Sequence, residues 1–140
     1  MLKSGLPDGR ARVGDTEKLT INLGVVDLGQ IDLLVQEGFY SNRTDLIRTA
    51  IRNQLALHAD QVQRTVARRT LVLGVQNITR ADLLHAQREG QMLHIHVVGL
   101  ARIAEDVTPE LARATIKTVE VLGAFHASQP VRIALADRIL

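Results

Sequence analysis

Three polar side chains alternate with three aliphatic ones in residues 18–23 (KLTINL), and the polar set could bind a hydrogen-bonding surface. The alternation has the period of two that is typical of a half-buried β-strand, and Gly24 closes it. The two faces of this predicted strand carry Lys18, Thr20 and Asn22 on one side and Leu19, Ile21 and Leu23 on the other. The polar face therefore offers an ammonium, a hydroxyl and an amide group, each able to form hydrogen bonds.

A second chemically capable group lies at the start of a predicted helix. Asn42 and Asp45 have the three-residue spacing of a capping pair, and apolar residues then follow at helical spacing through Leu55. Free backbone amides at a helix start favour an anion, and Arg43 adds positive charge there. The sequence thus predicts an anion-binding helix start.

Two histidines are the best candidates for metal ligands in this sequence. His94 and His96 alternate on one predicted strand, so their side chains share a face at about 7 Å, and His85 or His126 could join them. A stable site needs three or four ligands, and the chain contains no cysteine. We therefore favour a structural role for the histidines and expect no metal and no cofactor.

The remaining chemistry-bearing residues form no catalytic pattern. Glycines are isolated rather than gathered in a phosphate-binding loop, and the serines and histidines lack the spacing of a nucleophile and its base. The acidic residues are scattered along the chain. We expect that the protein is not an enzyme.

Composition predicts a globular protein with an aliphatic core. Hydrophobic residues make up 46% of the 140 residues and aromatic residues only 2%. The net charge is +2, but residues 43–69 carry six arginines against two acids, a bias that suits a phosphate backbone. No stretch has the length of a signal peptide or a membrane span, so we expect a cytoplasmic protein.

The chain divides into four predicted parts. Residues 1–16 have no hydrophobic period and are expected to form a flexible basic arm. Residues 17–57 contain the strand, a first helix capped by Asp27 and ended by Gly38, and the second helix. The helical pattern continues through 58–69 as a predicted connector. Residues 70–140 form the fourth part, in which short apolar segments typical of strands replace the continuous helical pattern.

The C-terminal part contains three similar segments, at 70–86, 94–114 and 118–136. Each has a Val- and Leu-rich strand, a glycine at its end, a polar bend and a helix-like stretch, with Thr79 and Thr108 as predicted helix caps. Units of this size cannot bury their own apolar faces, so neighbours are expected to stack. We interpret 70–140 as a strand-helix repeat module for oligomerisation or partner binding, which makes the whole chain α+β.

The N-terminal part needs a second copy to form a core. A single strand has no partner at either edge, and two short helices bury too little apolar surface to form a core. Two copies related by a two-fold axis could pair their strands antiparallel over four helices. The predicted dimer core comprises Leu19, Ile21, Leu23, Ile31, Leu34, Ile47 and Ile51.

This arrangement resembles the ribbon-helix-helix family of the CopG, Arc and methionine repressors. The similarity lies in KLTINL and in VDLGQIDLLVQEGFYSNRTDLIRTAIRNQL, and GFYSNRTDLIRTAIR is its most characteristic stretch. The resemblance implies a dimeric two-stranded ribbon in the major groove of double-stranded DNA. It implies base contacts from Lys18, Thr20 and Asn22, and phosphate contacts from Asn42, Arg43 and Thr44.

The corresponding functional prediction is a transcriptional regulator, most simply a repressor associated with the nucleoid. Three alternatives use the same DNA-binding half. One is an antitoxin that autoregulates its operon and binds a toxin protein, and another is a metal- or ligand-responsive repressor that uses His94 and His96. The last is a partition or nucleoid-organising protein.

Overall fold

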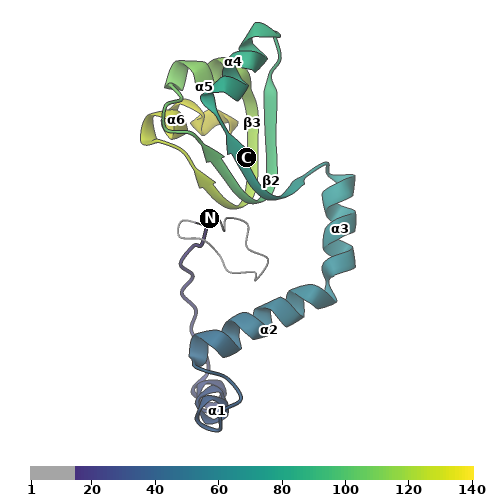
Figure 1. Ribbon diagram of the computed structural model, residues 1–140, viewed down its shortest axis with the longest axis vertical. Helices are drawn as coiled ribbons and strands as arrows, with labels where there is room; N and C mark the ends of the chain where they lie inside the picture. The colour runs from purple at the N-terminus through teal and green to yellow at the C-terminus, as the bar shows by residue number, and fades with distance from the viewer. Residues whose placement is uncertain (1–14) are drawn as a thin grey trace, which may run out of the picture. The chain divides into compact units, whose positions relative to one another are not determined.

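The computed structural model describes residues 15–140 (Figure 1). These residues form both helices and strands, which confirms the α+β class. The elements in chain order are α1 (Val25–Gln36), α2 (Arg43–Leu57), α3 (Ala59–Arg68), β1 (Val72–Ile78), α4 (Arg80–Arg88), β2 (Leu93–Ile103), α5 (Pro109–Thr115), β3 (Ile116–His126), α6 (Gln129–Ala134) and the short 3-10 helix η1 (Ala136–Arg138). The predicted arm, 1–16, lies almost wholly outside the described residues.

The described chain forms two compact units, whose boundary falls inside α3. The N-terminal unit is Thr16–Thr65, and the C-terminal unit is Val66–Leu140 together with Asp15.

Helix α1 begins earlier than the sequence predicts. Its N-cap is Gly24, which makes no side-chain cap hydrogen bond, so the prediction of Asp27 as the cap was wrong. Asp27 instead lies in the first turn, where a carboxylate interacts favourably with the helix dipole. The prediction for the other end is confirmed. Gly38 has a φ of 86°, and the N–H groups of Gly38 and Phe39 donate to the carbonyls of Val35 and Leu34, as in a Schellman motif.

Helices α2 and α3 are separate, whereas the apolar pattern predicts that helix could continue to Arg69. The break lies at His58, whose N–H donates to the carbonyl of Leu55 at 3.1 Å, a three-residue step that tightens the last turn of α2. The carbonyl of His58 then accepts from the N–H of Val62 and begins the ladder of α3. The predicted connector, 58–69, is thus a short helix of its own.

Helices α1, α2 and α3 contain no buried residue. Several of their large apolar side chains are exposed, among them Leu33, Leu55 and Leu57. A single copy of the N-terminal unit therefore has no core of its own.

The C-terminal unit is a three-stranded sheet with the order β1-β2-β3, in which both neighbouring pairs are parallel. Figure 1 shows α4, α5 and α6 gathered on one side of this sheet. The core between sheet and helices includes Ile95 and Val97 of β2, Leu83 of α4, Ala112 of α5 and Val131 of α6, all fully or almost fully buried. Aliphatic burial of this kind is the main stabilisation of the unit.

Side-chain caps begin the three α-helices that pack on the sheet, α4, α5 and α6. Thr79 and Asp82 form a reciprocal capping box at α4, and the Thr108 hydroxyl accepts from the N–H of Leu111 at α5, so both predicted caps are confirmed. Sequence reasoning did not assign Ser128, whose hydroxyl accepts from Val131 N–H at the start of α6. The hydrogen bonds from Thr79 also hold the pKa of the Asp82 carboxyl below its usual value.

Three glycines lie in one row across the sheet, inside the strands. Gly74, Gly99 and Gly123 are partners in register, and each has a φ between 123° and 136°. The prediction that these glycines end the strands was wrong, because glycine adopts this positive φ without steric cost and each ladder continues beyond it. Glycine kinks curve a sheet, and the long strands are visibly curved in Figure 1.

Candidate nucleic-acid interface

The predicted recognition strand belongs to no helix or strand within the single chain. Residues 16–24 precede α1, and Lys18, Thr20 and Asn22 are exposed there. The aliphatic side of the same segment is exposed too, with Leu19 at 81% and Ile21 at 58%. Both faces are thus available, and the contacts of the polar face with bases stay a prediction.

The start of α2 is built as the sequence predicts. Asn42 Oδ1 accepts from the N–H of Asp45 at 2.8 Å, and the Asp45 carboxylate accepts from the N–H of Ser41 at 2.9 Å, so the capping pair is confirmed. Because the Asn42 oxygen is used in the cap, the side-chain group it could offer a phosphate is its amide NH₂. Thr44 is exposed on the first turn, where backbone amides lack intrahelical acceptors.

Arg43 makes an ion pair that the sequence did not predict. Its Nε and Nη2 atoms donate to the two carboxylate oxygens of Asp32 in α1, at 2.7 and 2.8 Å. These hydrogen bonds, and the charge of the guanidinium, hold the pKa of Asp32 below its usual value. No local rule signals a pair eleven residues apart on two helices. The cation predicted to contact phosphate is therefore partly neutralised by its own chain.

We expect Asp32→Asn to strengthen DNA binding by roughly two- to fivefold, the range for an exposed ion pair that no longer competes with phosphate. The variant should also give a steeper dependence of log affinity on log salt. Fluorescence anisotropy with a labelled duplex at several salt concentrations measures both quantities. Asp60→Asn, which removes a carboxylate from the first turn of α3, is the matched control. Equal changes in the two variants would show a general charge effect and contradict a specific role for the Asp32 pair.

The acid response of this pair has a defined sign. Arg43 lowers the pKa of Asp32. The ion pair therefore stabilises the unit fully at any pH above the ordinary pKa of a carboxyl group. This stabilisation is lost as the pH falls through the lowered pKa of Asp32. Protonation then releases Arg43, so acid and Asp32→Asn act in the same direction.

The predicted dimer-core residues all lie in the N-terminal unit, and none is buried in the single chain. Ile31 and Ile47 are half-buried, whereas the remaining members are exposed: Leu19, Ile21, Leu23, Leu34 and Ile51. Their packing against a second copy stays a prediction.

The histidine pair is held by a threonine. His94 Nδ1 lies 2.8 Å from Thr118 Oγ1 on the neighbouring strand, and His96 Nε2 lies 3.3 Å from the same oxygen. The ring centroids are 5.9 Å apart. Within residues 15–140, no three His, Cys, Asp or Glu side chains are grouped so that they could hold a metal ion. This arrangement gives both imidazoles a protein hydrogen-bond partner.

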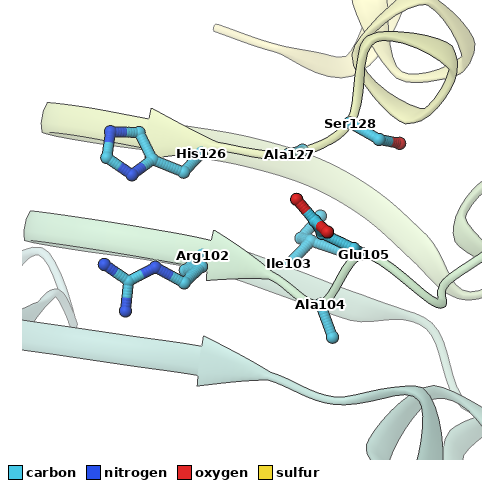
Figure 2. A pocket seen from close by; sticks show the side chains of 7 residues that line it. All are labelled: Arg102, Ile103, Ala104, Glu105, His126, Ala127 and Ser128. Atoms are coloured by element: carbon cyan, nitrogen blue, oxygen red, sulfur yellow. The ribbon is translucent and has the colours of Figure 1, made fainter. Parts of the chain in front are cut away.

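A pocket of about 280 Å³ opens where β2 and β3 end. Figure 2 shows Arg102 and His126 on the two strands, and Glu105 and Ser128 on the loops that follow. This edge is where parallel sheets commonly bind ligands. The Arg102 guanidinium, however, donates to Asp15 at 3.0 Å and to Asn77 at 3.3 Å. The main cation of the pocket is thus already engaged, and the lining defines no particular ligand.

Comparison with known proteins identifies the class. The chain belongs to the Ribbon-Helix-Helix transcriptional regulator family, whose model matches residues 14–132. The match includes the predicted strand and the two helices that resemble the family, and it also covers most of the C-terminal unit. Membership suggests DNA binding and dimerisation in transcriptional regulation, and such regulators are typically not enzymes. No curated protein and no solved structure gives a match.

None of the helices between residues 15 and 140 combines the length and the apolar character that a transmembrane helix needs.

Proposed function

We propose that the protein is a sequence-specific DNA-binding repressor that acts as a homodimer. The observation that carries the proposal is that α1, α2 and α3 bury no residue in one copy, while large apolar side chains such as Leu33, Leu55 and Leu57 are exposed. A second copy would bury those side chains and pair the two segments at residues 18–23 as an antiparallel ribbon. Such a protein works on the nucleoid in the cytoplasm.

The proposed ribbon reads bases through Lys18, Thr20 and Asn22. A major groove admits a two-stranded ribbon. In such a ribbon, lysine can donate hydrogen bonds to guanine and asparagine can pair with adenine. Threonine can form a hydrogen bond with a base or contact the methyl group of thymine. Asn42, Arg43 and Thr44 contact phosphate at the start of α2. This division, with bases read by the ribbon and phosphates held by the helix start, separates specificity from affinity.

Two-fold symmetry of the dimer implies an operator with inverted half-sites. The net charge of +2 is modest for a DNA-binding protein, so several dimers bound along the operator would raise affinity. The C-terminal unit is the part available for such higher assembly or for a protein partner.

We expect the double variant Lys18→Ala/Asn22→Ala to lose operator discrimination by about tenfold or more, because each lost base contact costs about 1–3 kcal/mol. Its helical circular dichroism should be unchanged, since both side chains are exposed. Competition binding with operator and scrambled duplexes measures the ratio.

Lys117→Ala is the matched control, since it removes one exposed lysine from β3 and should leave the ratio unchanged. An unaltered ratio in the double variant would contradict base reading by this segment.

A further inference from the structure

One face of the C-terminal sheet has no cover among the described residues. Core side chains of β2, such as Ile95, Val97 and Ala101, point to the side where the helices pack. Side chains alternate along a strand, so the residues between them point to the opposite side. We name this side the open face and define its apolar part by two rows in register: Leu73, Val98 and Leu122, and Val75, Leu100 and Ala124.

The open face is unusually apolar for a surface. Leu73, Val75 and Leu122 are each about half exposed, at 49%, 51% and 50%. Leu100, in the middle strand of the same face, is buried between its neighbours, and it is absent from the core cluster beneath the helices. Sheets with only parallel strands occur almost exclusively with both faces covered. This sheet therefore needs a cover on its open face.

Polar residues border the apolar rows at both ends of the strands. At the amino end, His94 and His96 share Thr118, and Arg69 pairs with Glu120. At the carboxyl end, Arg102 pairs with Asp15 and bonds to Asn77. An apolar centre with a polar rim is the usual anatomy of a protein interface.

We propose that the open face packs against the open face of a second copy of this chain. The family of this chain suggests dimerisation, so a second C-terminal unit is tethered nearby whenever two N-terminal units are joined, which raises its effective concentration. Each polar border contains both a cation and an anion. When two copies related by a two-fold axis come together, neither copy therefore presents a border of only one charge sign to the other. Two such sheets would pack about 10 Å apart.

This inference rests on the proposed dimeric regulator, and its test separates the two. In the full chain, Ile21→Asp disrupts the ribbon contact and leaves the open face to hold two copies together. We expect this variant to remain a dimer by light scattering but to lose operator binding. Adding Leu122→Glu should then weaken self-association more than about 100-fold, because a carboxylate is buried in an apolar contact. Adding Ile133→Glu instead should not, since Ile133 is exposed at 66% on α6.

The outcomes are distinct. An Ile21→Asp chain that is already monomeric would overturn pairing through the open face, whereas an Ile21→Asp chain that still binds the operator would overturn the proposed ribbon. If Leu122→Glu lowered stability without changing the mass, the cover would be another part of the same chain, and the proposal would fail.

A second measurement does not depend on a destabilising charge. The chain has no cysteine, so Leu122→Cys and Ile133→Cys each introduce a single thiol. A short bis-maleimide should link two copies through position 122 and not through position 133. Linkage at neither position, or equally at both, would contradict the inference.

Discussion

Gly99→Ala is expected to lower the free energy of unfolding of the C-terminal unit by about 3 kcal/mol or more. A Cβ atom at Gly99 would lie 2.1 Å from the carbonyl oxygen of Gly74 on the neighbouring strand, and the φ of 136° strains any L side chain. Backbone strain costs about 1–3 kcal/mol, and overpacking adds about 1–3 kcal/mol. Gly123→Ala should behave in the same way, because its Cβ would meet the Gly99 oxygen at the same distance.

The row of glycines contains its own control. Gly74 has nearly the same φ, 135°, but a Cβ there meets nothing within 4 Å, so Gly74→Ala should cost only the strain of about 1–3 kcal/mol. Urea unfolding followed by circular dichroism measures the three variants. Equal losses for Gly74→Ala and Gly99→Ala would show that backbone conformation alone, and not the close approach of the strands, requires glycine.

Ile21→Asp is expected to lower operator affinity more than about 100-fold. In the proposed dimer, Ile21 lies in the core beneath the ribbon, and an unpaired carboxylate there costs several kcal/mol. Since α1, α2 and α3 bury no residue in a single copy, the variant should also lose helical circular dichroism. Gel shift with an operator duplex and thermal unfolding of the full chain measure these effects.

The control for this substitution is Arg48→Glu. Arg48 is exposed on α2, so the variant also makes the N-terminal unit more acidic without placing a charge beneath the ribbon. It should weaken DNA binding through charge but retain the helical signal and its thermal midpoint. Retention of both by Ile21→Asp as well would contradict the proposed core.

Features set by neighbouring residues were predictable from the sequence. The capping pair at Asn42, the caps at Thr79 and Thr108, and the left-handed Gly38 all depend on side chains or backbone angles within a few residues. The period of the apolar residues likewise predicted a mixture of helices and strands. Local rules suffice here because the interactions are themselves local.

Features set by distant residues were not predictable in the same way. The ion pair of Asp32 with Arg43 depends on how α1 and α2 lie together, and it changes what Arg43 can offer a phosphate. The glycines were assigned to strand ends because glycine usually interrupts strands, yet here Gly99 and Gly123 each leave room for a backbone carbonyl of the neighbouring strand. The break at His58 has no glycine or proline to signal it.

The lack of buried residues in the first three helices links DNA recognition to protein abundance. If the ribbon forms only when two chains meet, the operator-competent species grows with the square of chain concentration while dimers are scarce. The C-terminal unit, in contrast, has a core within each single chain. A cell holding few copies would then contain chains with a core at one end and no ribbon to recognise their target at the other, and a modest rise in synthesis would produce a sharp onset of gene control.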